Sequence, residues 1–175
     1  MNLPNRKPTR LRNYDYARQN DYYVTICTYG KNHLFGATKK LNEYGKIAAD
    51  EPLKVPEHFD GVSIEKYIIM SNHIHAIIRI GGNVGAERSR PFPTVSAVVG
   101  LYKSGVSKRI HEKDPGVRVW QKSFYDRVIR NEQEYQAVWR YIDENPLRLL
   151  TASAAEESLG GAENGFDHPS RRERA

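Results

Sequence analysis

Residues 62–80 hold two runs of apolar and β-branched residues, VSIEKYIIM and HIHAIIRI, separated only by Ser71 and Asn72. Each run is short and rich in isoleucine or valine, so both are predicted to be β-strands rather than helices. With two residues between them, they form either a tight hairpin or one long strand with a bend. A chain with two such apolar strands near its middle needs further strands and a covering layer of helices or sheet to bury their apolar side chains.

Two further segments are predicted to be strands, because aromatic and β-branched residues dominate both. They are residues 22–29, YYVTICTY, and residues 117–129, VRVWQKSFYDRVI. Apolar residues at helical spacing predict helices in residues 41–53 and 94–112. Thr94 or Ser96 can cap the second helix, while Gly100 and Gly105 count against it.

A last helix is predicted to begin after the capping residue Asn131 and to end before Pro146. The resulting order, β-α-β-β-α-β-α, is that of an α+β, ferredoxin-like (split βαβ) fold with one added C-terminal helix. Its four strands would form an antiparallel sheet with helices on one face. We assign residues 21–150 to this domain, 1–20 to a basic arm and 151–175 to a flexible, Gly-rich polar tail.

Charge is distributed unevenly along the 175 residues, whose net charge is +6. Residues 151–175 contain three arginines and five acidic residues, so the positive excess lies in the rest of the chain. A basic body suits a polyanionic partner such as nucleic acid. No stretch approaches the roughly 20 apolar residues of a membrane span, and Cys27 is the single cysteine, so we expect a cytoplasmic protein without a membrane partner.

His73 and His75 lie two positions apart on a predicted strand. Because strand side chains alternate between faces, both imidazoles should point the same way while Ile74 points into the opposite layer. Two neutral imidazoles on one face can bind a metal ion, although two ordinary strand histidines would have the same spacing.

Two histidines leave a metal ion with an incomplete set of ligands, so a further ligand must come from elsewhere in the chain. Tyr141 and Asn145 lie four residues apart in the predicted last helix and so share one of its faces. The amide oxygen of Asn145 can bind a hard cation, and the phenol of Tyr141 can attack a phosphorus atom nearby. Imidazole and amide ligands together with phosphate oxygens suit Mg²⁺ or Mn²⁺.

The run YIIMSNHIHAII resembles the histidine-hydrophobic-histidine (HUH) motif of single-tyrosine transposases. The runs DYYVTICTYGKNHLFG, VWQKSFYDRVIRNEQEY and YIDENPLR resemble the first strand, the last strand with its helix entry, and the tyrosine helix of the same enzymes. The resemblance is to the REP-associated tyrosine transposases and covers roughly residues 10–150. This chain has Ser71 where many relatives have proline, which does not affect a ligand position.

The resemblance implies a ferredoxin-like fold, a divalent metal and cleavage of single-stranded DNA near a hairpin through a 5′-phosphotyrosine. His73 and His75 match the HUH ligands, Tyr141 matches the nucleophile and Asn145 matches the third polar ligand. Among the 11 tyrosines, Tyr125 is the main rival nucleophile. Related enzymes act as monomers or dimers, so a second copy of the chain is a candidate partner beside DNA.

Basic residues in three parts of the chain are candidate DNA contacts, although each could instead belong to a solvated surface. They are Arg10 and Arg12 in the arm, Lys103, Lys108 and Arg109 in the second helix, and Arg127 and Arg130 at the last strand.

Three other functions fit parts of the pattern. The first is a non-catalytic module that binds single-stranded nucleic acid through Tyr23, Tyr29 and Phe124, which leaves the histidine pair unexplained. The second is a metal-dependent nuclease that uses water, in which Tyr141 would be dispensable. The third is a degenerate transposase that binds its hairpin without cutting, against which the intact set of site residues argues.

Overall fold

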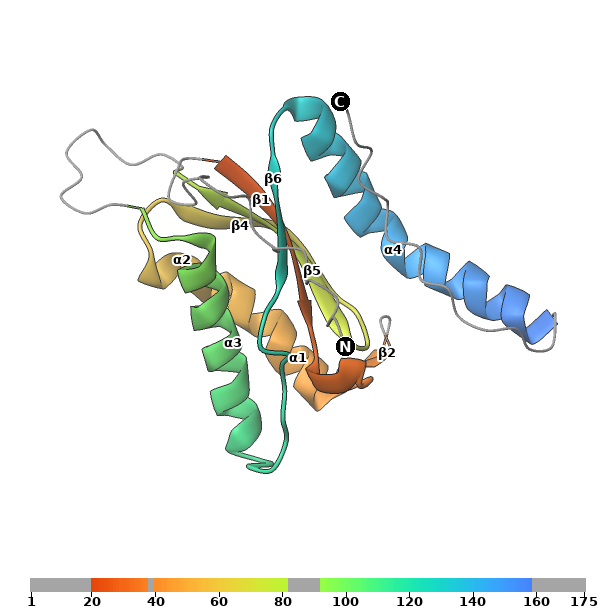
Figure 1. The fold of residues 1–175 in the computed structure, drawn as a ribbon. Helices are drawn as coiled ribbons and strands as arrows, with labels where there is room; N and C mark the ends of the chain where they lie inside the picture. Colours follow the sequence, from red (N-terminus) through yellow and green to blue (C-terminus); the bar gives the residue numbers. More distant parts are fainter. Residues whose placement is uncertain (1–19, 38–39, 82–91, 159–175) are drawn as a thin grey trace, which may run out of the picture.

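Four strands form one antiparallel sheet in the spatial order β4-β5-β1-β6 (Figure 1). The computed structural model describes residues 20–37, 40–81 and 92–158, with side chains described as far as Asn145. The strands are β1 (Asn20–Cys27), β4 (Val62–Ile69), β5 (His73–Ile80) and β6 (Tyr125–Ile129). The helices are α1 (Glu43–Asp50), α2 (Val55–His58), α3 (Val95–His111) and α4 (Glu132–Ser158).

The two central runs of the sequence form a hairpin, because β4 and β5 pair in antiparallel fashion on either side of Ser71 and Asn72. β5 lies between β4 and β1, so it has hydrogen-bonded neighbours on both edges. The element order and this strand order confirm the predicted α+β, ferredoxin-like fold. Short segments not predicted from the sequence also form a small ladder, β2 (Gly36–Ala37) with β3 (Lys40–Leu41), and 3-10 turns at Tyr29–Lys31 and Glu51–Lys54.

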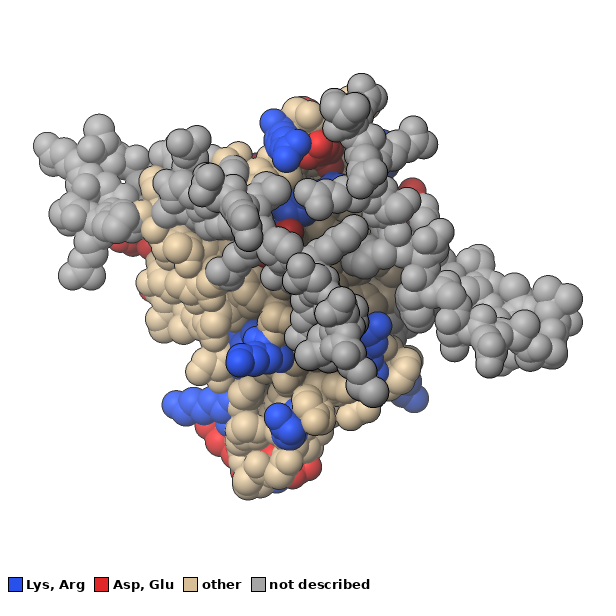
Figure 2. Space-filling view, in the orientation of Figure 1, with Lys and Arg blue, Asp and Glu red and all other residues tan. Residues whose placement is uncertain are grey.

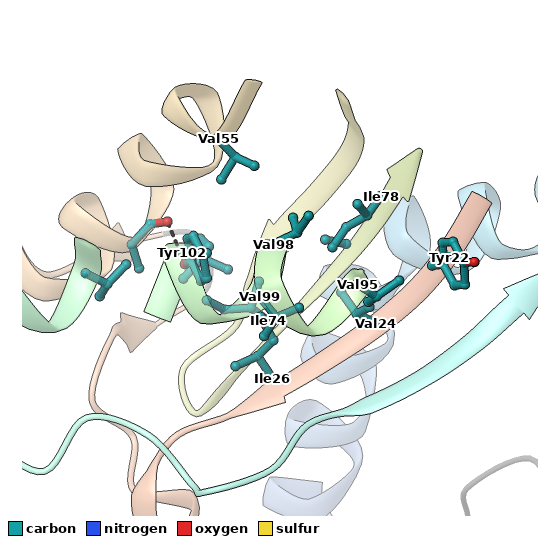
Figure 3. Close-up of a cluster of buried hydrophobic side chains, with 14 of the residues drawn as sticks. Tyr22, Val24, Ile26, Val55, Ile74, Ile78, Val95, Val98, Val99 and Tyr102 are labelled. Atoms are coloured by element: carbon teal, nitrogen blue, oxygen red, sulfur yellow. Dashed lines mark hydrogen bonds between the residues drawn. The ribbon is translucent and has the colours of Figure 1, made fainter. Parts of the chain in front are cut away.

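The main hydrophobic core lies between the sheet and the helices α1 and α3. Alternate residues of β1 and β5 point into it, and α3 adds a stripe of buried residues that begins at Val95, one position after the capping Thr94. Figure 3 shows this cluster, in which the Tyr102 hydroxyl donates a hydrogen bond of 2.8 Å to the carbonyl of Ala48 in α1. That bond satisfies the one polar atom that Tyr102 brings into the core.

A second, smaller cluster lies on the opposite face of the sheet, where α4 packs (Figure 1). Ile77 of β5 and Ile129 of β6 contact Val138 and Ile142 of α4 there, and all four are buried. The sheet is therefore covered on both faces, by α1 and α3 on one side and by α4 on the other.

The predicted fourth strand is wrong in its first half, because only Tyr125–Ile129 pairs as a strand. The preceding segment makes hydrogen bonds elsewhere: the Trp120 indole donates to the carbonyl of Lys103, and the Lys103 ammonium donates to the carbonyl of Gln121 at 2.6 Å. An isolated bridge joins Trp120 to Thr28. Packing of Trp120 against α3 and the end of β1 thus overrides the strand propensity of this segment.

The last helix does not end before Pro146, as the sequence predicted, but continues to Ser158. Proline removes one helical hydrogen bond and usually ends a helix. Here the following residues, LRLLTASAAEES, are rich in strong helix formers, which favours continuation beyond the proline. The segment assigned to a flexible tail therefore begins as helix over residues 151–158, and its remainder lies outside the described residues.

The two glycines that counted against α3 occupy different environments, and they give a matched pair of substitutions. A Cβ at Gly105 would lie 2.4 Å from a carboxylate oxygen of Glu51, which is held by Lys54 and Arg109, whereas a Cβ at Gly100 meets nothing within 4 Å. We expect Gly105→Ala to lower the free energy of unfolding by about 1–2 kcal/mol. Gly100→Ala should raise it by about 0.5–1 kcal/mol, as alanine does in an open helix position.

Urea unfolding monitored by circular dichroism measures both effects. If both variants raised the free energy of unfolding by the same amount, the Glu51 side chain would have moved aside at no cost, and the expectation for Gly105→Ala would be contradicted.

Within the described ranges, no helix combines the length and the apolar character needed to cross a lipid bilayer.

Candidate metal and nucleophile site

Strand β5 places His73 and His75 on the face of the sheet that α4 covers, while Ile74 between them is 1% exposed in the main core. The two Nε2 atoms lie 3.1 Å apart and the ring centroids 4.6 Å apart. The predicted common direction of the two imidazoles is therefore confirmed. Their convergent nitrogens are an arrangement that one metal ion could use.

Each histidine has a hydrogen-bond partner on its other ring nitrogen. Nδ1 of His73 lies 2.7 Å from the amide oxygen of Asn72, and Nδ1 of His75 lies 2.7 Å from the hydroxyl of Tyr23 and 2.9 Å from that of Thr25. Because an amide oxygen only accepts hydrogen bonds, His73 must carry its proton on Nδ1 to make this bond. Its Nε2 then keeps a lone pair directed at His75, which is the form that binds metals.

Burial, and to a lesser extent the positive charge of Lys31, lowers the pKa of His73 from 6.5 to about 4. His73 is therefore neutral at neutral pH, so a metal ion would not have to displace a proton from it.

This depressed pKa predicts a pH dependence of stability in the metal-free protein. Below pH 6.5 the unfolded chain takes up a proton at His73, whereas the folded chain does so only near pH 4. The free energy of unfolding should therefore decrease between pH 6.5 and pH 4, by up to about 2–3 kcal/mol from this group. Chemical denaturation in the presence of a chelator measures the decrease, which should be smaller in His73→Leu; an equal decrease in that variant would rule out His73 as its source.

Tyr141 projects from α4 toward the histidine pair. Its ring centroid lies 5.4 Å from that of His75 at an interplanar angle of 70°, and 6.2 Å from that of Tyr23 at 87°. Asn145 follows one helical turn later in α4 and is 8% exposed. The structure thus brings Tyr141 into ring contact with the sequence-predicted ligand His75.

The docking of α4 fixes the position of Tyr141. Ile142, the residue after it, is 1% exposed and packs in the second cluster. Lys66 of β4 forms an ion pair with Asp143 and lies 4.3 Å from the ring centroid of Trp139. Apolar burial, an ion pair and a cation–π contact therefore hold this part of the helix to the sheet.

Tyr125, the rival nucleophile, lies on the edge strand β6 directly opposite Thr25. Paired residues of adjacent strands point to the same face, so its side chain shares the face of the histidines, and it is 51% exposed. Because β1 lies between β6 and β5, Tyr125 is one strand further from the histidine pair than Tyr23.

Two of the predicted DNA contacts on α3 have partners within the protein. Lys103 donates to the backbone of Gln121, and Arg109 pairs with Glu51 at 2.9 Å and Asp50 at 3.3 Å. Both lie with exposed Lys108 on the helix that covers the face away from the histidines. The arm residues Arg10 and Arg12 lie outside the described residues.

The basic residues of the last strand lie closer to the site. Arg127 is exposed and pairs in register with Tyr23, so it points to the face of the histidines. Arg130 is exposed at the end of β6. In Figure 2 the visible lysine and arginine side chains lie apart from one another, with acidic side chains among them at the lower end of the molecule. DNA contact by any of these residues stays a prediction.

A cavity of about 370 Å³ opens at the start of α4, and its lining includes Asp21, Arg79, Arg130 and Tyr135 but neither histidine. Arg79 pairs there with Asp21 at 2.7 Å and with Glu65 at 3.1 Å. Two carboxylates thus offset the charge of this arginine, which makes the cavity a poor match for a phosphate group.

Sequence reasoning missed the neighbours that orient the two histidines: Tyr23, Thr25 and Asn72. Tyr23 was considered only as a base-stacking residue. The period of two in β1 shows that Tyr23 and Thr25 share a face, but only the pairing of Thr25 with His75 shows that it is the face of the histidines. Burial raises the pKa of Tyr23 above its ordinary value, so its hydroxyl keeps its proton at neutral pH.

The donor set fits a hard divalent cation only when oxygen ligands complete it. Among the described residues, no three histidine, cysteine, aspartate or glutamate side chains come together at one point. Beyond the two imidazoles, the remaining ligands would be an amide oxygen such as that of Asn145, water or substrate oxygens. Such a mixed set, open to substrate, is typical of catalytic rather than structural metal sites.

Comparison with known proteins supports the fold. No established family profile matches the chain. An uncharacterized protein of Haemophilus influenzae is 29% identical over 162 residues, which cover 83% of this chain and 90% of the relative. The structure of a REP-associated tyrosine transposase bound to a REP hairpin has a TM-score of 0.60 and 16% identity, and the match covers 95% of this chain and 98% of that one.

Proposed function

We propose, from a fold shared with a REP-associated tyrosine transposase, that this protein cleaves and rejoins single-stranded DNA at hairpin-forming sequences. The observation that carries the proposal is the convergence of the two Nε2 atoms, 3.1 Å apart, on the face where Tyr141 contacts His75. Two convergent imidazoles that could hold a metal ion, beside a tyrosine, suit phosphoryl transfer to a protein side chain.

In this proposal His73 and His75 would hold Mg²⁺ or Mn²⁺, and Asn145 would contribute its amide oxygen. The cation would polarise the scissile phosphate and neutralise the charge that develops on it. The hydrogen bonds on Nδ1 keep both imidazoles in the orientation that ligation requires. The neutral state of the half-buried His73 supports this role at neutral pH.

Tyr141 acts as the nucleophile. Its phenolic oxygen loses its proton and forms a bond to the phosphorus, the bond from phosphorus to the 3′ oxygen breaks, and the departing 3′ oxygen takes up a proton, so the proton count is unchanged. The 5′ end of the DNA is then held as a phosphotyrosine ester. A free 3′-OH attacks this ester in the reverse sense, so strands can be rejoined without a nucleotide cofactor.

A covalent-adduct assay tests the proposal. The full chain is mixed with labelled single-stranded hairpins from the flanks of its own gene, with Mn²⁺ or Mg²⁺, and resolved on a denaturing gel. We expect a labelled band of slower mobility that does not form when a chelator is present from the start. Cleavage without such a band would identify a nuclease that uses water, and tight binding with no cleavage of any hairpin would identify a binding module.

A further inference from the structure

The 3-10 turn Tyr29–Lys31 is fastened beside the histidine pair. Cys27, the last residue of β1, pairs in register with His73, so the two side chains share one face of the sheet. The next residue, Thr28, is fully buried; its N–H donates to the carbonyl of Asn72 at 3.0 Å, and its hydroxyl lies 2.9 Å from the same oxygen. The turn therefore begins directly after a backbone hydrogen bond to the residue that precedes His73.

Lys31 has a backbone conformation that lysine rarely adopts. Its φ of 57° is the one positive value among the non-glycine residues of the described ranges, and it follows Gly30, whose φ is 61°. The N–H of Lys31 donates to the carbonyl of Thr28 at 3.1 Å, and the N–H of Asn32 donates to that of Tyr29 at 3.2 Å, which holds the turn in this form. Glycine or asparagine would adopt the left-handed conformation at less steric cost, so a lysine here indicates a use for its side chain.

The charge of Lys31 is available to an anion. Lys31 is exposed, and no carboxylate in the described part of the chain forms an ion pair with it. Burial has the largest effect on the pKa of both His73 and Cys27, and the positive charge of Lys31 lowers the pKa of each. The charge thus acts on the face of the sheet that carries the histidines, in agreement with the backbone position of the turn.

A positive charge beside two metal ligands is unfavourable for metal binding alone, because it repels the cation that His73 and His75 would hold. A phosphate group reverses this balance, since its negative oxygens can be shared between a metal ion and a lysine. The ammonium of lysine, a point charge on a flexible four-carbon chain, suits such a contact. The position of Lys31 is therefore favourable when a phosphodiester is bound.

We propose that Lys31 is a catalytic residue whose ammonium binds a non-bridging oxygen of the scissile phosphate. The inference rests on the proposed function and adds a residue to its site. The contact stabilises the negative charge of the phosphate while Tyr141 attacks, and it lowers the barrier to the extent that this charge grows in the transition state. No proton leaves Lys31 in the step, so its contribution is electrostatic.

Binding without cleavage tests where Lys31 contacts the DNA. In a Tyr141→Phe background with a chelator present, fluorescence anisotropy measures the affinity for a hairpin that the wild type cleaves. Lys31→Met should lower this affinity about fivefold and reduce the slope of log K against log salt by about 0.7, as expected for one phosphate contact on a single strand. A hairpin with a neutral methylphosphonate at the scissile position should bind equally well with and without the Lys31→Met substitution.

Lys46→Met is the matched control, because Lys46 is exposed on α1, which covers the other face of the sheet. It should leave both the affinity and the salt slope at their parent values.

The adduct rate at saturating DNA and Mn²⁺ tests the catalytic role. Lys31→Met should lower the rate about 100-fold, and Lys31→Arg, which keeps the charge, should recover part of the loss. The Mn²⁺ affinity of the DNA-free protein, measured by electron paramagnetic resonance, should be unchanged or higher in Lys31→Met. Lys31→Gly should lower the adduct rate as Lys31→Met does, while its thermal midpoint stays at or above the wild-type value, because glycine accepts the positive φ.

Three results would overturn the inference and leave the proposed function standing. The first is a wild-type adduct rate in Lys31→Met. The second is an equal loss of affinity on the native and the methylphosphonate hairpins, which would place the contact elsewhere on the DNA backbone. The third is a lower Mn²⁺ affinity of DNA-free Lys31→Met, which would attribute a slower rate to the metal site. Absence of an adduct in the wild type on every hairpin would instead overturn the proposed function, and this inference with it.

Discussion

Tyr141→Phe is expected to abolish covalent attachment to DNA, with a loss of at least about 1,000-fold in the rate of adduct formation. Phenylalanine keeps the ring that packs edge-on against His75, and it leaves the neighbouring Ile142 in the second cluster. Only the phenolic oxygen is lost, so the fold and the binding of Mn²⁺ should change little. The single-turnover rate on a denaturing gel measures the effect, and the thermal midpoint reports on folding.

Tyr125→Phe is the matched control, because it removes a phenolic oxygen from the same face of the sheet at a position that is 51% exposed. Its adduct rate should stay within about threefold of wild type, since exposed substitutions away from a site have small effects. An adduct that persists in Tyr141→Phe and disappears in Tyr125→Phe would transfer the nucleophile to β6.

His75→Ala is expected to have the second largest effect, a loss of Mn²⁺ affinity of at least about 100-fold together with the loss of the adduct. The substitution removes one of two convergent Nε2 atoms and leaves the hydroxyls of Tyr23 and Thr25 without their common partner. His75 is 5% exposed, so alanine also leaves a cavity beside Tyr141. Electron paramagnetic resonance of free Mn²⁺ measures the affinity directly.

His33→Ala serves as the control for His75→Ala, since His33 is exposed and bonds to Ser71 outside the site. It should bind Mn²⁺ with wild-type affinity. Unchanged Mn²⁺ binding in His75→Ala would show that the histidine pair is not the metal site.

Local periodicity was sufficient to predict the centre of this fold. Alternation along β5 correctly placed Ile74 in the core and the two histidines together on the other face. The capping Thr94 and the apolar stripe of α3 likewise identified that helix, whose bounds differ from the prediction by one residue at each end. These features depend on neighbours two to four residues away, which a sequence displays directly.

Features that depend on distant partners were not predictable in the same way. Trp120 packs against α3, and the segment before Tyr125 therefore lies outside the sheet, although it has the composition of a strand. Arg109 has the positive charge expected of a DNA contact, yet its guanidinium donates a hydrogen bond to Glu51, 58 positions earlier. The contact of Tyr23 with His75 spans 52 positions. Each requires the strand register or the helix packing to be known first.

Strand β5 also separates what the protein needs for folding from what it would need for chemistry. Ile74, Ile78 and Ile80 point into one layer and the two histidines into the other. Substitutions can therefore accumulate in one set with little effect on the other. A lineage could exchange both histidines for residues of similar volume and still produce a folded, basic protein. If the proposed reaction is correct, relatives that kept this fold but lost the reaction would be identified by the residues at positions 73 and 75, and not by any change in the fold.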